Sequence, residues 1–393
     1  MKLELDMFQT LLVAVAALLL GQFLRKKIRF FTTFCIPAPV VGGLIFSTVT
    51  LALYLLHVLE LSFDGTIKDL CMLMFFTTVG FQANLKTLRK GSVGLLLLLA
   101  AVTGLIVLQN AAAVGIGKLL RIDPLAALCT GSIPMVGGHG TAGAFGPILE
   151  DLGVTGATTI CTAAATFGLI AGSIMGGPVG RMLVNRYRLT PKPEDVQSAA
   201  AQTESTSESG GSYAKAVYLI AIAMGVGTLF SKLLGLTGLT FPNYIGGMLA
   251  AAILRNVSEY TGKISINMKH VDDVGSISLS LFLGIAMITL RFWELADLAL
   301  PLLVLLAGQT VLMFLYARFA VFNILGRDYD AAVITSGVCG FGMGATPNAM
   351  ANMDAMTTKY GASIKAYLLV PIVGGMFVDF INSLIVTGCI NIL

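Results

Sequence analysis

Charge is scarce in this chain. Lys, Arg, Asp and Glu together make up 12% of its 393 residues, whereas a soluble domain carries about 25%. A soluble protein of this length needs more charge to cover its surface, so a cytosolic enzyme and a disordered chain are excluded. The net charge of +4 does not indicate a nucleic-acid binder, because the basic residues stand in short clusters between apolar runs.

Residues that carry chemistry are also few. The chain has 3 His and 6 Cys, and no two cysteines form a CxxC pair. Each Cys lies in or beside an apolar segment, so we interpret the cysteines as small buried residues and not as a disulfide framework or a zinc site. A membrane-embedded enzyme would need a nucleophile, a metal cluster or paired acids. We therefore expect no enzymatic activity and no cofactor.

Apolar residues are abundant, at 56%, and a helix needs about 20 of them to cross a bilayer. These long apolar runs predict an all-α, polytopic membrane protein. Two further apolar stretches, 124–150 and 331–357, are rich in Gly and Pro, and we expect them to be re-entrant or broken segments. The predicted crossings number ten and lie near residues 7–24, 38–56, 69–85, 92–116, 157–180, 214–232, 241–256, 275–290, 298–325 and 362–390.

Lys and Arg in the loops predict the orientation of these crossings. With both termini outside, 18 of the Lys and Arg residues fall on the inside and six on the outside. Lys68 and Arg291 are among the outside residues. The polar stretch 190–212 then becomes a flexible cytoplasmic linker.

This linker divides the chain into two similar halves, 1–189 and 213–393. Ile-Pro-Ala-Pro-Val-Val-Gly-Gly at 36–43 corresponds to Phe-Pro-Asn-Tyr-Ile-Gly-Gly at 241–247, and Asp123 before the first Gly-rich stretch corresponds to Asp328 before the second. Each half has an odd number of crossings, so the second is inserted upside down. Inverted repeats that are interrupted at the same place are typical of secondary transporters.

The two Gly-rich stretches offer the chemistry of a transport site. Interrupted helices expose backbone carbonyls that coordinate cations such as Na⁺. The half-helices that restart near Thr141 and Thr346 present positive N-termini, which suit a carboxylate. Alternatively, the glycines serve close helix packing. A channel is a weaker alternative, because two different Gly-rich segments in one chain do not resemble a multi-subunit filter.

Asp379 lies well inside the last apolar run, where an unpaired carboxylate costs about 2.5–3.5 kcal/mol. A bound Na⁺ would neutralise it, with Asn382 and Ser383 one turn away; the alternative is a carboxylate that is hydrogen-bonded at a helix break. Gln109 and Gln309 lie at matched positions of the two halves and either line the path or bond neighbouring helices. His139 either donates to the substrate or fixes its loop.

Long and uncommon motifs stand at 36–44, Gln109–Asn110, 137–141, 166–168, 176–178, 278–282, 329–332, 339–347 and 351–353. By these motifs the chain resembles the bacterial sodium/glutamate symporters, over nearly its whole length apart from the linker. This resemblance implies Na⁺-driven uptake of glutamate across the bacterial inner membrane, with no cofactor besides Na⁺ as coupling ion. It also implies two inverted repeats of five helices and an elevator-type transport part that moves against a dimerisation scaffold in a homodimer. The alternative is a Na⁺- or H⁺-coupled carrier of another small organic acid.

We predict site residues from both Gly-rich segments and from the polar residues of the neighbouring spans. The predicted substrate contacts are Ser132, Gly137, Gly138, His139, Gly140, Thr141, Gly342, Gly344, Ala345, Thr346, Asn348, Gln109 and Gln309. The predicted Na⁺ ligands are Asp379, Asn382, Asn110, Cys339, Gly340 and Asn352.

Overall fold

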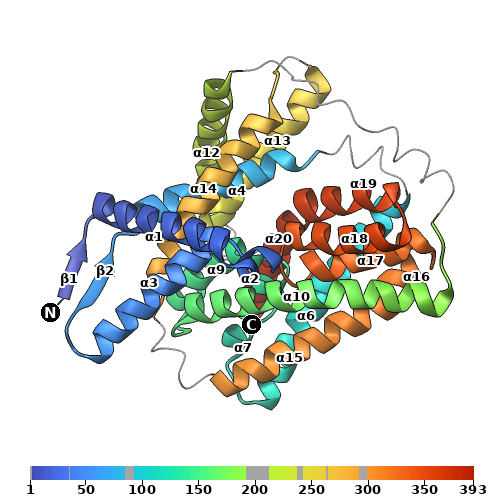
Figure 1. Ribbon diagram of the computed structural model, residues 1–393. Helices are drawn as coiled ribbons and strands as arrows, with labels where there is room; N and C mark the ends of the chain where they lie inside the picture. Colours follow the sequence, from blue (N-terminus) through green and yellow to red (C-terminus); the bar gives the residue numbers. More distant parts are fainter. Residues whose placement is uncertain are drawn as a thin grey trace. The chain divides into compact units, whose positions relative to one another are not determined.

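Helices make up nearly all of the structure. The computed structural model describes residues 2–34, 36–84, 93–191, 212–236, 242–262, 264–291 and 299–393, which Figure 1 colours in sequence order. Within these ranges, seven helices are long and apolar enough to cross a membrane, or eight if the bent pair Ile364–Gly375 and Val378–Ile392 is one span. The prediction of a multi-pass membrane protein is therefore confirmed.

The long apolar helices coincide with predicted crossings. Two other predicted crossings, 69–85 and 241–256, correspond to α4 (Thr66–Gln82), which has 17 residues, and to α13 (Asn243–Thr261), which carries Arg255 and Glu259. Neither is among the seven, so the count of ten stays a prediction. The seven are α1 (Met7–Lys27), α3 (Ala38–Leu55), α6 (Val93–Leu119), α10 (Ala157–Tyr187), α12 (Tyr213–Gly235), α14 (Met268–Ile288) and Leu300–Ile324, which comprises α15 (Ala299–Tyr316), a π-helical turn Ala317–Val321 and α16 (Phe322–Ile324).

The chain folds as two compact units, and each takes segments from both halves of the sequence. Unit 1 comprises Met1–Gln82, Ala142–Ala163 and Gly211–Leu300. Unit 2 comprises Ala83–Thr141, Ala164–Gly210 and Pro301–Leu393. Most of the predicted linker 190–212 and the predicted buried cysteine Cys35 lie outside the described residues. Four of the five described cysteines are buried, as predicted, and the fifth, Cys389, is only partly buried.

In unit 1, glycines allow two pairs of helices to approach closely. A Cβ on Gly42 of α3 would lie 1.7 Å from the carbonyl oxygen of Ala17 in α1, so only glycine fits. The same happens between α12 and α13, where a Cβ on Gly246 would lie 2.1 Å from the carbonyl oxygen of Gly227. Gly42 and Gly246 belong to the two corresponding Pro/Gly motifs. Each motif begins a helix after a proline, at Pro37 or at the buried Pro242, because proline has no N–H to lose at a helix start.

Unit 1 is also held by contacts between α3 and α14 and between α4 and α13. The Ser47 hydroxyl in α3 donates to the Met287 carbonyl in α14 over 2.5 Å. Phe76 of α4 stacks on Tyr244 of α13 with ring centroids 4.0 Å apart, and Phe145 packs edge-on to the same tyrosine. Aromatic pairs at these separations add about 0.5–1.5 kcal/mol beyond their buried area.

The structure contains a small two-stranded sheet that the all-α prediction did not include. β1 (Lys2–Leu5) pairs in parallel with β2 (Glu60–Phe63), Lys2 opposite Glu60 and Leu5 opposite Phe63. Asp6 then starts α1 through a capping box with Gln9, which fixes the end of β1. Strands of four residues carry too little periodicity to be recognised beside long apolar helices. A short helix, α2 (Arg29–Thr33), follows α1.

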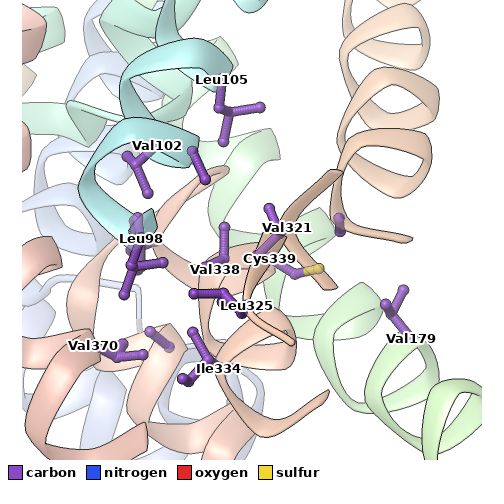
Figure 2. Packing of buried hydrophobic residues seen from close by; sticks show 14 of the residues in the cluster. Leu98, Val102, Leu105, Val179, Val321, Leu325, Ile334, Val338, Cys339 and Val370 are labelled. Carbon is purple, nitrogen blue, oxygen red and sulfur yellow. The ribbon is translucent and has the colours of Figure 1, made fainter. Parts of the chain in front are cut away.

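The core of unit 2 is apolar and is built from α6, α10, the helices after Pro301 and α17 (Tyr329–Phe341). Figure 2 shows Leu98, Val102, Ile334, Val338 and Val370 converging in it. The first Gly-rich segment is divided into α7 (Pro124–Leu128), α8 (Ser132–Met135) and α9 (Gly138–Asp151). The second is divided into α17 and α18 (Thr346–Tyr360).

The last predicted crossing, 362–390, is not one straight helix. It consists of α19 (Ile364–Ile372), a π-helical turn Val373–Phe377 and α20 (Val378–Ile392), with a 40° bend between its two parts. Pro371 has no N–H for the helical ladder, and Gly374 and Gly375 follow it, so the regular helix is interrupted here. The bend precedes Asp379 directly.

The close approach of α1 and α3 predicts that Gly42→Ala destabilises unit 1 by about 1–3 kcal/mol, because the methyl group collides with backbone and not with a movable side chain. Thermal unfolding of the purified protein in detergent measures this. Gly225→Ala is the matched control, since nothing lies within 4 Å of a Cβ at that position of α12. Equal melting temperatures for the two variants would contradict the close packing.

Candidate functional site

All of the predicted site residues lie in unit 2, and the interruptions of the two Gly-rich segments bring several together. α18 begins at Thr346, as predicted, but α9 begins at Gly138, three residues before Thr141. Gly138 has φ of 59°, a left-handed conformation that glycine adopts without strain. The chain can therefore turn into α9 at that residue.

The two interruptions meet at their glycines. A Cβ on Gly138 would lie 2.8 Å from the carbonyl oxygen of Gly344 in the second segment. A Cβ on Gly137 would lie 2.8 Å from the Asn382 amide nitrogen of α20 and 2.2 Å from the Thr141 hydroxyl. The first segment thus touches both the second segment and the helix that carries Asp379.

Ser132, at the start of α8, is the centre of a hydrogen-bond network. Its main-chain N–H donates to Asn110 Oδ1 over 2.9 Å, and Asn110 Nδ2 donates to the Ser132 hydroxyl over 2.8 Å. Asn382 Nδ2 donates to the Ser132 carbonyl over 3.2 Å. All three residues are buried. Asn110 and Asn382, predicted as Na⁺ ligands, therefore share one partner that was predicted to contact substrate.

Gln109 and Gln309 connect helices through their amide groups. Gln109 Nε2 donates to the carbonyl of Gly342, where α17 ends, over 2.8 Å. Gln309 Nε2 donates to the main-chain carbonyl of Gln109 over 2.8 Å. The amide nitrogens of Gln109 and Gln309 thus bond neighbouring helices, which was one of the two predicted roles. Both side-chain oxygens are buried without a hydrogen-bond partner among the described residues.

The second segment is held by α10 and by the bent last span. Asn348 Nδ2 donates to the Leu169 carbonyl over 2.9 Å, and Asn352 Nδ2 donates to the Gly172 carbonyl over 3.0 Å. The Thr346 hydroxyl donates to the carbonyl of Gly374 over 3.1 Å. The N-terminus of α18 is therefore fixed against the π-helical turn, and its preceding residue, Ala345, bonds back to Gly340.

His139 is buried, and its Nε2 lies 3.0 Å from the Thr166 hydroxyl of α10. This bond supports the interpretation that His139 fixes its loop, and it leaves Nδ1 for another partner. Thr166 was not among the predicted site residues, although it lies in one of the motifs that carried the family resemblance. Gly140 follows in the first turn of α9.

Asp379 lies in the first turn of α20 and is partly buried. It makes no hydrogen bond or ion pair with any described residue, so the alternative of a carboxylate hydrogen-bonded at the break finds no support. Asn382 and Ser383 are three and four positions further on, on the same helix face. Asn382 Oδ1 and Ser383 Oγ are both buried without a partner in the described chain. A carboxylate and two unpaired oxygens on one face suit a hard cation.

The other three predicted Na⁺ ligands gather elsewhere in unit 2. The carbonyl oxygens of Cys339 and Gly340 would lie 2.9 and 3.2 Å from a Cβ on Gly172, the residue whose carbonyl binds Asn352. The Cys339 thiol is buried in the apolar core, where Figure 2 shows it beside Val338 and Leu325. Among the described residues, no hydrogen bond joins this group to Asp379. Any part that Cys339 has in cation binding therefore involves its carbonyl.

The chain is similar to known proteins over nearly its full length. Residues 3–362 match the family model described as Sodium/glutamate symporter. The Sodium/glutamate symporters of Escherichia coli and of Shigella flexneri are each 41% identical to it over 389 residues, covering 98% of this chain and 97% of the relative. The Sodium/glutamate symporter of Haemophilus influenzae is 38% identical over 383 residues, covering 96% of this chain and 95% of the relative.

The Ser132 network predicts an energetic coupling between Asn110 and Ser132. We expect a double-mutant cycle of Asn110→Leu and Ser132→Ala to give about 1–2 kcal/mol, the upper end for polar pairs in membrane proteins, because two side-chain hydrogen bonds join the two residues. Thermal unfolding in detergent provides the four free energies. Asn323→Leu in place of Asn110→Leu is the control, since Asn323 bonds within its own helix. Additive effects for the Asn110 cycle would refute the network.

Proposed function

The chain belongs to the sodium/glutamate symporter family, a family of transporters and not of enzymes, and we propose that it takes up glutamate by Na⁺-driven symport. One structural observation carries the proposal beyond the family. Two interrupted helical segments of unit 2 meet at Gly138 and Gly344, beside a helix whose only carboxylate within the described span, Asp379, has no protein partner there. No observation above favours a carrier of another organic acid.

We propose that the two halves, 1–189 and 213–393, are inverted repeats, with re-entrant segments at 124–150 and 331–357. Corresponding landmarks support this. The two Pro/Gly motifs both begin a helix that packs closely on the helix before it. Asp123 and Asp328 both cap the helix that opens a Gly-rich segment, accepting from main-chain N–H groups at 2.9 and 2.8 Å.

We propose that unit 2 is the transport part and that unit 1 is the scaffold of an elevator-type homodimer. The confinement of every predicted site residue to unit 2 supports this division. Exposed apolar residues on α1 and α12 of unit 1, such as Phe8, Leu12, Tyr218 and Leu229, suit contact with lipid or with a second copy. We further propose that the protein lies in the bacterial inner membrane, with both termini outside and the linker 190–212 in the cytoplasm; the Lys and Arg bias of the loops supports this orientation.

For the substrate, we propose that its carboxylates lie at the N-termini of α9 and α18. Helix N-termini present free N–H groups and about half a positive charge. Gly138, Gly140 and Thr346 stand at these two ends, and the His139 ring is close enough to the first to donate through Nδ1. The unpaired oxygens of Gln109 and Asn348 are suited to accept from the α-ammonium group.

For the coupling ion, we propose that Na⁺ is bound by Asp379, Asn382 Oδ1 and Ser383 Oγ. Ser383 extends the predicted set, and its buried unpaired hydroxyl is the reason. The carbonyls of Cys339 and Gly340, with Asn352, form the candidate for a second ion. Carboxylate, amide and carbonyl oxygens are the ligands that hard cations prefer.

Purified protein in K⁺-loaded liposomes tests the function directly. Dilution into Na⁺ buffer should drive accumulation of labelled L-glutamate, whereas dilution into choline buffer should not, because the inward Na⁺ gradient is then absent. Folding of the reconstituted protein is verified by its melting temperature. No accumulation in either buffer by folded protein would refute glutamate symport.

Asp379→Asn should lower Na⁺-driven uptake by about tenfold or more, because it removes the charge that balances the cation while keeping the size of the side chain. Initial uptake rates over a range of Na⁺ concentrations measure this. Asp123→Asn is the matched control, because asparagine caps a helix as well as aspartate does. An Asp379→Asn variant with the Na⁺ dependence of the unmodified protein would exclude the cation role.

A further inference from the structure

Unit 1 contains a polar pocket that shares no residue with the candidate transport site. Its volume is about 480 Å³, within the usual range for small-molecule sites. Three segments line it: the turn between β2 and α4, the end of α9 with the turn into α10, and the end of α14. Four charged residues stand among the lining residues: Asp64, Lys68, Glu150 and Arg291.

The charges of this pocket are not all neutralised by one another. Among the described residues, Lys68 forms an ion pair with Asp69 alone, at the long distance of 3.9 Å, and its side chain is 21% exposed. Glu150 makes no ion pair with a described residue; its Oε1 accepts the N–H of Thr158 over 2.9 Å at the start of α10. Cation and carboxylate therefore remain available to a ligand within one pocket.

Hydrogen bonds organise the pocket walls. The Thr66 side chain and main chain both bond to Asp64, the latter over 2.7 Å, and these bonds hold the pKa of the Asp64 carboxyl below its usual value. The Thr159 hydroxyl accepts the Arg291 N–H over 3.4 Å. The Thr158 hydroxyl is buried without a hydrogen-bond partner among the described residues, so it offers a donor to an incoming group.

We propose that this pocket is a second binding site, for an acidic amino acid such as the transported one. An acidic amino acid has two carboxylates and one ammonium group. Lys68 provides the charge for one carboxylate, the buried Thr158 hydroxyl donates to the other, and Glu150 provides the charge for the ammonium group. Neither an inorganic anion nor a simple cation would use both signs of charge.

The predicted topology agrees with such a role. The turns at 64–68 and 151–156 and the end of α14 at Arg291 are far apart in sequence, and the Lys and Arg bias places each of them outside. Their convergence on one pocket gives the outer surface a concave polar site. The proposal rests on the proposed function for its choice of glutamate as ligand.

Equilibrium binding of labelled L-glutamate to the full chain in lipid nanodiscs tests this. We expect two sites per chain in Na⁺ buffer and one in choline buffer, because the pocket needs no Na⁺. Glu150→Gln should weaken the Na⁺-independent site by about tenfold or more, since its amide oxygen still accepts from Thr158 while the charge is lost. Lys68→Gln should do the same. Asp151→Asn is the control, because this neighbouring exposed carboxylate does not line the pocket.

Two outcomes would overturn the proposal: a single, Na⁺-dependent site, or a Na⁺-independent site that neither Glu150→Gln nor Lys68→Gln weakens. Either result with normal uptake in liposomes would leave the proposed function intact. If both variants weaken Na⁺-independent binding but the unmodified protein shows no uptake, the result would refute symport and support the proposed binding site in the pocket. Melting temperatures show that each variant is folded, and the two variants alter different elements, so a folding defect in one leaves the other as the test.

Discussion

A backbone that leaves the helix within a membrane must have its polar groups satisfied by the protein itself, because lipid offers no hydrogen bonds. Unit 2 meets this constraint with side-chain amides and hydroxyls. Gln109 donates to the carbonyl where α17 ends, Thr346 donates to the π-helical turn, and Asn382 donates to the start of α8. The interruptions of the two Gly-rich segments depend on these donors, and the positions of the half-helix ends depend on the interruptions.

The same constraint determines which groups remain for a ligand. Four buried amides, each of which donates its nitrogen to a main-chain carbonyl, leave the amide oxygen without a hydrogen bond to any described residue: Gln109, Gln309, Asn348 and Asn382. A buried amide oxygen without a partner costs about 1–3 kcal/mol. A cation or an ammonium group bound to these oxygens would remove that cost. The residues that hold the broken helices together therefore also leave oxygens that favour positive charge.

Much of this arrangement could be predicted because residue type and spacing have direct physical consequences. Gly and Pro clusters showed where helices break, and Asp379 was conspicuous as a carboxylate in an apolar run. The hydrogen-bond partners could not be predicted, because Leu169 and Gly172 contribute only their carbonyls, which every residue has. The bend between Gly375 and Val378 was missed because apolar residues flank it on both sides. The sheet of β1 and β2 was missed because four-residue strands show too little alternation.

Glycine has different structural roles in the two units, and each half of the sequence contributes glycines to both roles. In unit 1, Gly42 and Gly246 lie inside regular helices and let neighbouring helices touch, which favours a rigid body. In unit 2, Gly138 and Gly344 lie where helices stop, and their contact joins two interruptions. Gly42 and Gly246 lie at corresponding places of the two halves, and Gly138 and Gly344 lie in the two corresponding Gly-rich segments. Each half of the sequence therefore contributes both to a closely packed unit and to a unit with interrupted helices, which is the combination that the proposed scaffold and transport part require.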